Sequence, residues 1–484
     1  MIEILFLEKE ESMLRYTLRV RDLVHGTILF TDTERRIIDH PYFQRLRQVR
    51  QNDVAFYVYP SLNTSRFEHV LGTCRVAGMM AENLTKSPKW RIYARELKRQ
   101  TGISSKEDFI LLARLYALLH DIGHLPLSHL FEMAFESWTG KQRAARVVEE
   151  WTRVSGFKKL HEALGATIVR RMVQDLKLSK SVRSTLLRVT TEKILPPQDP
   201  LQIVKLVVDS DIDADRIDAT QRDGFSAGGE YGHYDIRRLC DSVFIERNEE
   251  GWIIAYSEKA LTSMEALLLD RYRIHLWVHF HHRVVAMKTL VGFLIENALT
   301  RKLITKEHFN LRKPNTFVLK DDVWLWNVLR EMATSGGTLE MVKRAVFLRE
   351  KHGTLNLWKT RPGSQALRKR AADKAGAAIF IVENFDDYCH HLSARMKVPM
   401  LGFEAHFEPI SEKKILLYSE EEKRLTGKEI REVSRLVAGL TALWEDDPKE
   451  FFLLVGKNVR ARRVQLRDRW VEETADWIRN PRLL

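Results

Sequence analysis

The stretch that decides the fold is Leu118–His129, which reads LLHDIGHLPLSH. It ends an apolar run whose three- and four-residue spacing is typical of an amphipathic helix. Gly123 and Pro126 stop such a helix, so the adjacent His120 and Asp121 lie at its C-terminal end. An imidazole and a carboxylate at the end of a buried helix are candidate metal ligands, although one His-Asp pair alone is more often a pair on the protein surface.

Two further segments supply ligands of the same kind. His69 begins a second amphipathic run in the sequence SRFEHVLG, and the stretch DIDADRID at 211–218 holds four aspartates in eight residues. Asp215 and Asp218 are three residues apart and can share a helix face, whereas Asp213 points elsewhere. Taken alone, this stretch also fits a solvated or helix-capping acidic turn. Two imidazoles and two carboxylates suit one divalent ion from the group Mn, Fe, Ni, Zn, Co and Mg, and suit Ca poorly.

The composition is that of a globular protein with ample length for a buried core. The chain has 484 residues, of which 44% are hydrophobic and 30% charged, a length that favours two or three domains. Cys74, Cys240 and Cys389 are far apart, which indicates neither a disulfide framework nor a thiolate zinc site and fits a reducing, cytoplasmic location. No run is apolar enough for a membrane span, and we identify no signal peptide. The net charge of +13 favours polyanionic partners such as nucleotides or nucleic acid.

The periodicity predicts a mainly α fold, with a helical core and a small β-hairpin, followed by a smaller α+β C-terminal lobe. We expect a first domain over residues 1–350 and a basic C-terminal lobe over residues 351–484. Helical patterns cover 109–119, 164–176 and 427–444, and strand-like segments cover 27–30, 243–245 and 252–256 (a hairpin with its turn at 248–251), 378–382, 414–418 and 451–455.

His69, His120–Asp121 and Asp215 reproduce in order the H…HD…D pattern of the HD-domain phosphohydrolase superfamily. The flanking sequences RDLVHG, FQRLR and RFEH resemble the deoxynucleoside triphosphate (dNTP) triphosphohydrolase branch, which includes the SAM-and-HD-domain dNTP hydrolase and bacterial dGTPases. The resemblance extends from about Arg21 to His281. It implies a metal-dependent enzyme in which water attacks the α-phosphorus of a dNTP and releases a deoxynucleoside and triphosphate.

The resemblance also implies a role for each matching residue. The metal ligands are His69, His120, Asp121 and Asp215; the catalytic residues are His124, His161 and Asp218; the phosphate-binding residues are Arg66, His129, Arg216 and Arg271; and the sugar- and base-binding residues are Gln51, Asn52, Asp223, His275 and His279. Without the motifs around them, such histidines are more often packed structural residues and such arginines surface ion pairs.

Three departures from the family pattern predict altered sugar and base pockets. Asn52-Asp53 stands where the family usually has Leu-Gly, Ala219 stands where it has a tyrosine, and His279 replaces a tyrosine on the base side. The leucine of the usual pair helps these relatives to exclude ribose, so its replacement leaves deoxyribose selection open.

These departures and the basic charge keep two other hypotheses open. The first is an HD-type nuclease or phosphodiesterase acting on single-stranded DNA or RNA or on a signalling nucleotide, with Lys351–Arg370 and Lys457–Arg469 as basic surfaces and Trp470 stacking on a base. The second is a nucleotide-binding regulator that retains the metal site. The resemblance further implies a homo-oligomer and a regulatory nucleotide bound between subunits. No membrane partner is expected.

Overall fold

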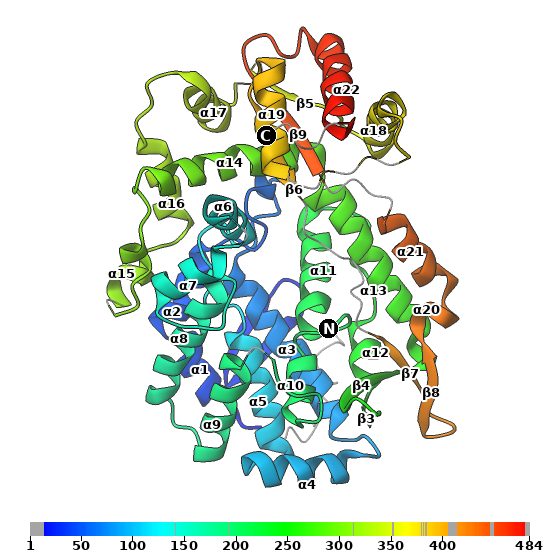
Figure 1. The fold of residues 1–484 in the computed structure, drawn as a ribbon. Coiled ribbons are helices and arrows are strands. Elements are labelled where there is room, and N and C mark those ends of the chain that lie inside the picture. The colour runs from blue at the N-terminus through cyan, green and yellow to red at the C-terminus, as the bar shows by residue number, and fades with distance from the viewer. Residues whose placement is uncertain are drawn as a thin grey trace, which may run out of the picture.

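The computed structural model of this chain describes residues 14–140, 142–192, 194–312, 314–350, 353–378, 380, 382, 385–404, 414–445 and 450–479. Helices dominate this part of the chain, which confirms the predicted mainly α fold (Figure 1). The helices up to residue 300 are α1 (Asp32–Ile38), α2 (Pro41–Gln44), α3 (Arg66–Leu84), α4 (Trp90–Thr101), α5 (Lys106–Leu119), α6 (His129–Thr139), α7 (Ala144–Thr152), α8 (Leu160–Asp175), α9 (Lys180–Thr191), α10 (Leu201–Leu206), α11 (Ala214–Ala227), α12 (Ile236–Asp241), α13 (Leu261–Ile274) and α14 (His282–Thr300).

The later helices are α15 (Pro314–Val318), α16 (Asp322–Glu331), α17 (Gly337–Phe347), α18 (Arg361–Ala375), α19 (Phe385–Met396), α20 (Ile430–Val433), α21 (Arg435–Glu445) and α22 (Arg463–Arg479). The strands are β1 (Tyr16–Asp22), β2 (Gly26–Thr31), β3 (Val243–Arg247), β4 (Trp252–Ser257), β5 (Thr354–Asn356), β6 (Met400–Glu404), β7 (Leu416–Ser419), β8 (Arg424–Glu429) and β9 (Glu450–Val455). Short 3-10 turns cover Arg45–Gln48, Ala55–Tyr57, Glu258–Ala260 and Lys306–Phe309, and a π-helical turn covers His275–His279. None of the helices described here has the length and apolar character needed to span a bilayer.

Helix α3 is the centre of the first domain and packs against both α5 and α11. It begins where Ser65 and Glu68 form a capping box, each side chain accepting a hydrogen bond from the other residue's backbone N–H. Helix α5 ends at Leu119, with His120 as its C-cap, so the apolar run brings His120 to the helix end as predicted. Helix α11 begins after Asp213, whose carboxylate accepts a hydrogen bond from the Arg216 N–H. Helix ends therefore place the polar residues of the site.

Gly123 allows two backbones to meet next to the site. A Cβ atom at this position would lie 2.1 Å from the His161 carbonyl oxygen and 2.4 Å from the Gly165 nitrogen, both in α8. Only a residue without a side chain permits this approach, which holds the segment after α5 against the helix that carries His161.

Replacing Gly123 with alanine is expected to lower the free energy of unfolding by about 3 kcal/mol or more, because the clash is with backbone that has no rotamer to change. Gly292→Ala, in the middle of α14, is the matched control, since in the described part of the chain its Cβ would meet only Leu130 Cδ1, at 3.7 Å. That variant is expected to be neutral or up to about 1 kcal/mol more stable. Urea denaturation measures both, and equal stability of the two variants would contradict the close approach.

The predicted hairpin is present and belongs to a larger sheet. Strands β3 and β4 pair antiparallel, and the Asn248 N–H donates to the Gly251 carbonyl across the predicted turn. Strand β7 adds to β4 in parallel and β8 adds to β7, which gives the order β3-β4-β7-β8. Two strands from beyond residue 350 thus complete a sheet begun at residue 243, while the domain boundary at residue 350 stays a prediction.

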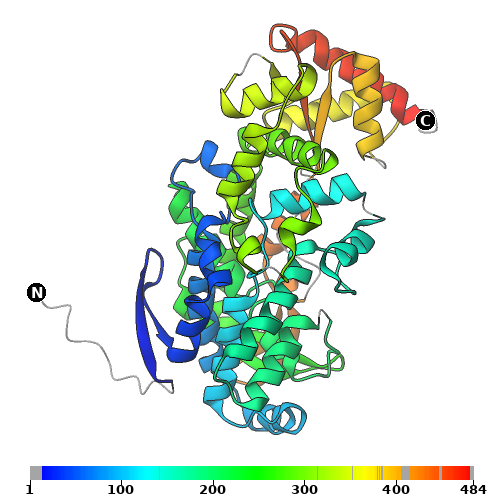
Figure 2. The ribbon, with the colours of Figure 1, turned by 90° about the vertical axis from the view of Figure 1, so that its left-hand side faces the viewer.

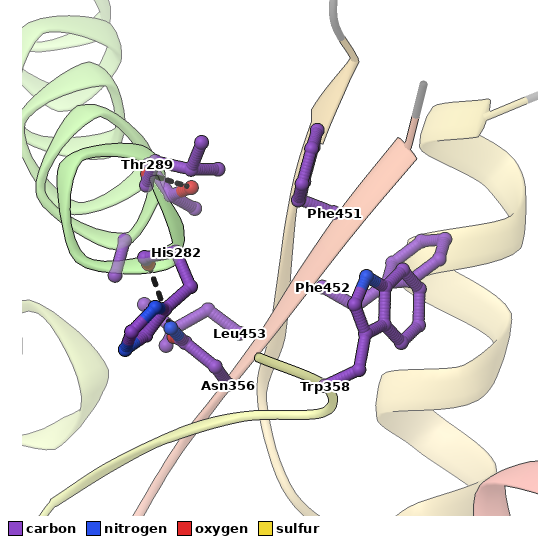
Figure 3. A pocket seen from close by; sticks show the side chains of 9 residues that line it. His282, Thr289, Asn356, Trp358, Phe451, Phe452 and Leu453 are labelled. Atoms are coloured by element: carbon purple, nitrogen blue, oxygen red, sulfur yellow. Dashed lines mark hydrogen bonds between the residues drawn. The ribbon is translucent and has the colours of Figure 1, made fainter. Parts of the chain in front are cut away.

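The rest of the C-terminal part forms a separate small core around the sheet β5-β9-β6. Figure 2 shows this sheet at the top of the molecule, with α18, α19 and α22 around it. Figure 3 shows where it meets α14: Phe451 and Leu453 of β9 line a small pocket with Thr289, and the Asn356 side chain donates to the His282 carbonyl at 2.7 Å.

Three details of the predicted C-terminal part are wrong in the described residues. Gly427 lies in strand β8 with a positive φ of 74°, so the predicted helix begins only at Ile430. Ala378, Phe380 and Val382 are not in a strand, and the other two residues of that predicted strand lie outside the described residues. Predicted strand 414–418 begins at residue 416, where pairing with β8 starts, and its pairing with β4 starts at Leu417.

Glu296 on α14 makes stability depend on pH. Burial raises the pKa of its carboxyl to about 7, and Asp386 adds to this effect. Because the unfolded carboxyl has a pKa near 4.3, the native state binds more protons than the unfolded state between about pH 4.5 and 7, and stability falls as pH rises through that window. Glu296→Gln is expected to be about 1–2 kcal/mol more stable than the parent at pH 8 and no more stable at pH 4. Denaturation at the two pH values tests this, and an advantage that is independent of pH would contradict it.

Candidate metal and phosphate site

The four predicted metal ligands come together where α3, α5 and α11 meet. His69 Nε2 is 2.7 Å from Asp215 Oδ1 and 3.9 Å from Asp121 Oδ2. His120 Nε2 is 3.4 Å from Asp121 Oδ1 and 3.7 Å from Asp215 Oδ1. Two imidazoles and two carboxylates from three elements therefore face one small volume.

These donors fit a bound cation. The Nε2 atoms of His69 and His120 are buried and have no partner with hydrogen-bond geometry among the described residues, although carboxylate oxygens lie close to both. Ligand atoms of His69, His120 and Asp121 all lie within 4.8 Å of one another. Burial lowers the pKa of His69, but the carboxylates of Asp215 and Asp218 outweigh burial and raise this pKa to about 10. The carboxylates thus favour positive charge here, and the mixed N/O donor set suits a divalent transition metal.

Asp218 lies behind His69, on the side away from the other ligands. Its Oδ2 is 2.8 Å from His69 Nδ1, and its Oδ1 is 2.6 Å from His25 Nε2 in the loop between β1 and β2. Arg222 donates to both oxygens at 2.9 Å and is itself held by Asp22. With its oxygens engaged in this way, Asp218 contacts the ring of His69 on the side away from the other ligands, as a residue that orients a metal ligand does. Its catalytic role stays a prediction.

Arg66 joins the ligands to the phosphate-binding candidates. Its Nη1 donates to Asp121 Oδ2 in a short contact, and its Nε donates to Ser128 Oγ at 2.9 Å. Its Nη2 is buried without a hydrogen-bond partner in the part of the chain that the structure describes. Burial raises the pKa of Asp121, but Arg66, His120 and His124 outweigh burial and hold it well below its usual range. Asp121 is therefore a carboxylate at neutral pH.

Three predicted histidines form one cluster beside Asp121. The rings of His124 and His161 stack with centroids 4.2 Å apart, and His129 meets His124 edge-on at 5.0 Å. His124 Nε2 is 3.2 Å from Asp121 Oδ1, while His161 Nδ1 is 3.1 Å from Glu132 Oε1 on α6. Burial, and after it the positive charge of Arg66, lowers the pKa of His124 and of His129 well below the usual value. Both rings are therefore neutral at pH 7.

The remaining predicted residues gather in two groups along α11. Near its start, Arg216 Nη1 is 2.5 Å and Arg271 Nη1 4.0 Å from Asp211 Oδ1, so two guanidinium groups meet at one carboxylate. Burial, aided by Arg216, lowers the pKa of Arg271 to about 9.

The second group lies further along the same helix, around Asp223. Asn52 Nδ2 donates to Asp223 Oδ1 at 2.6 Å, and His279 Nε2 is 3.3 Å from Asp223 Oδ2. The ring of His275 lies 4.9 Å from that of His279, within the π-helical turn. Gln51 precedes Asn52, and its backbone N–H pairs with the Thr64 carbonyl. Asp223 is eight residues from Asp215, which is about 12 Å along a helix.

The predicted stacking role of Trp470 is wrong. This side chain is fully buried and packs against Trp358, Phe380 and Phe452 in the C-terminal core. Several arginines of the basic surfaces are engaged locally: Arg467 donates to the Leu357 carbonyl and Arg370 to Asp468.

Residues 66–220 match the family model of the HD domain. These residues carry an HD domain. An uncharacterized protein of Methanocaldococcus jannaschii is 28% identical over 312 residues, which cover 64% of this chain and 54% of that protein. Deoxynucleoside triphosphate triphosphohydrolase SAMHD1 of Bos taurus is 32% identical over 154 residues, or 30% of this chain and 24% of that protein. The chain thus spans about half the length of the archaeal relative and about a quarter of the bovine enzyme.

A solved phosphohydrolase of Bacteroides thetaiotaomicron shares the fold, with a TM-score of 0.62 at 19% identity over 91% of this chain and 100% of that chain. The match extends well beyond the HD domain, so the helices and strands that follow residue 220 share its overall arrangement as well.

Sequence reasoning missed several residues around the HD domain. His25 and Arg222 contact Asp218, Asp22 contacts Arg222, and Glu132 contacts His161. His25 and Asp22 lie within the RDLVHG segment that carried the resemblance, so a signal for them existed. Glu132 stands in the run HLFEMAFE without any local feature that distinguishes it from a solvated acid.

Proposed function

We propose that this chain is a metal-dependent phosphohydrolase that cleaves dNTPs into deoxynucleoside and inorganic triphosphate, through His69, His120, Asp121 and Asp215 as metal ligands. The observation that carries the proposal is the convergence of these four side chains next to the stacked pair His124 and His161. The relation to SAMHD1, whose name states this activity, supports the substrate class.

A divalent ion held by these ligands supplies a more acidic bound water and neutralises phosphate charge. The protein residues do the rest. Neutral His124 is held beside Asp121 and can accept or donate a proton at a reacting oxygen, while Glu132 orients His161 for the complementary transfer. Arg66 and His129, with Arg216 and Arg271, present donors to the phosphate oxygens. The group of Gln51, Asn52, Asp223, His275 and His279 contacts the sugar and base.

The metal identity, assembly and location belong to the same proposal. The proposed cofactor is one divalent ion from the group Mn, Fe, Ni, Zn, Co and Mg, since each accepts nitrogen or oxygen donors. A homo-oligomer with a regulatory nucleotide between subunits is proposed from the relation to SAMHD1. A cytoplasmic location is supported by the three buried free cysteines.

A single competition experiment tests the substrate class. The full chain, supplied with each metal in turn, is incubated with mixed dNTPs, ribonucleoside triphosphates and end-labelled single-stranded DNA and RNA. Loss of dNTPs with intact labelled strands is expected. Mononucleotides or short fragments from the strands, with dNTPs untouched, would replace the proposal by the nuclease, and binding without turnover under any metal would replace it by the regulator.

A further inference from the structure

Two consecutive residues next to the site have unusual backbone conformations. Leu127 has φ of +55°, and Ser128 has φ of +50° with ψ of −122°, a region that normally requires glycine. Each such residue costs on the order of 1–3 kcal/mol and persists only where its surroundings hold it. The two residues form the turn that starts α6 at His129.

A buried carboxylate from a distant part of the chain holds this turn. Asp322 is fully buried at the start of α16, and its Oδ1 accepts a hydrogen bond from the Leu127 N–H at 2.7 Å. Its Oδ2 accepts from the Arg50 N–H at 3.1 Å and from Arg50 Nη1 at 3.2 Å. One side chain thus ties α16 to two loops that are otherwise far apart in sequence.

The same contacts continue into the metal site. Ser128 Oγ donates to the Arg50 carbonyl at 2.5 Å and accepts from Arg66 Nε at 2.9 Å. Arg66 in turn donates to Asp121. An unbroken series of contacts therefore runs from Asp322 through Arg50 and Ser128 to the guanidinium that faces the ligands.

We propose that Asp322 is a positioning residue of the phosphohydrolase site: it holds the strained Leu127–Ser128 turn and thereby fixes the phosphate-binding geometry of Arg66 and His129. The inference rests on the proposed function and adds to it a determinant that lies outside the matched HD domain. Asp322 touches neither substrate nor metal ligand and acts through its neighbours.

The test compares Asp322→Ala with Asp321→Ala. Asp321 is the adjacent N-cap of α16 and accepts from the Trp324 N–H at 2.9 Å, so its loss weakens the same helix without releasing the turn. Asp322→Asn, which keeps the volume and one acceptor, provides a milder change in case the alanine variant fails to fold. The readouts are hydrogen–deuterium exchange of the Leu127 amide and the separate kcat and KM for dNTP hydrolysis with Mn.

Asp322→Ala is expected to expose the Leu127 amide to exchange and to lower kcat/KM by about tenfold or more, mainly through KM, because charged phosphate contacts lose their alignment. Asp322→Asn is expected to fall between the parent and the alanine variant. Asp321→Ala is expected to lower the melting temperature while both readouts stay within about twofold of the parent.

Unchanged protection of Leu127 in Asp322→Ala, or an equal loss of activity in Asp321→Ala, would overturn the proposal. The exchange readout does not depend on turnover. A parent protein without dNTP hydrolysis would therefore count against the proposed function, while exchange at Leu127 would still decide whether Asp322 holds the turn.

Discussion

Asp121→Asn is expected to lower metal-dependent hydrolysis by at least about a thousandfold. Asp121 has one oxygen near His120 and His124 and the other near His69 and Arg66. An amide nitrogen on either side cannot ligate a cation, and the loss of negative charge removes the charged partner of the buried Arg66. The variant is therefore expected to lose tight Mn binding together with activity.

Titration calorimetry with Mn and initial rates on dNTPs measure the two effects. Asp241→Asn is the matched control, because Asp241 is exposed and, among the described residues, its carboxylate has only a loose ion pair with Arg237 at 3.7 Å. We expect that variant to bind Mn and turn over like the parent. Full activity of Asp121→Asn would show that the ligands are assigned incorrectly.

Asp218→Asn is expected to lower the free energy of unfolding by about 3 kcal/mol and to weaken Mn binding by about 10- to 100-fold. The asparagine cannot accept from His25, His69 and Arg222 together, so the buried guanidinium loses part of its compensation. The ring of His69 is then no longer fixed from behind.

The stability loss in Asp218→Asn depends on pH in a defined direction. Burial raises the pKa of Asp218, but Arg222, His25 and His69 outweigh burial and hold it well below the usual value. A carboxyl whose folded pKa is depressed contributes stability above its unfolded pKa, near 3.9, and loses it as pH falls towards the folded pKa. The difference between parent and variant should therefore shrink as pH falls below about 4, and it should also decrease above about pH 7, because Asp218 contributes to the raised pKa of His69. Urea denaturation from about pH 3 to 8 measures it, and a difference that grows as pH falls from about 5 to 3 would contradict the ionised, paired Asp218.

The elements that carry the ligands could be predicted because local signals define them. The apolar period ending at Leu119, the stop at Gly123 and the acidic N-cap at Asp213 each act within one helical turn. The order of His69, His120–Asp121 and Asp215 along the chain then indicated the superfamily, because few families have these residue types in this order.

The supporting contacts could not be predicted because they join residues far apart in the chain. His25 meets Asp218 across 193 residues and Asp322 meets Leu127 across 195, and neither aspartate differs locally from a solvated acid. The burial of Trp470 and the addition of β7 to β4 could not be predicted for the same reason. Each depends on how distant elements pack, which no local pattern records.

The position of bond cleavage in a dNTP tests the central claim most directly. The full chain with Mn is incubated with dNTPs in ¹⁸O-labelled water beside Asp121→Asn, and the products are identified by phosphorus NMR and mass spectrometry. Attack at the α-phosphorus with cleavage of its bond to the 5′ oxygen predicts one inorganic triphosphate per deoxynucleoside, with one ¹⁸O atom in the triphosphate and none in the nucleoside, and no product from the variant. Release of pyrophosphate or orthophosphate instead, or the same products from Asp121→Asn, would contradict the account.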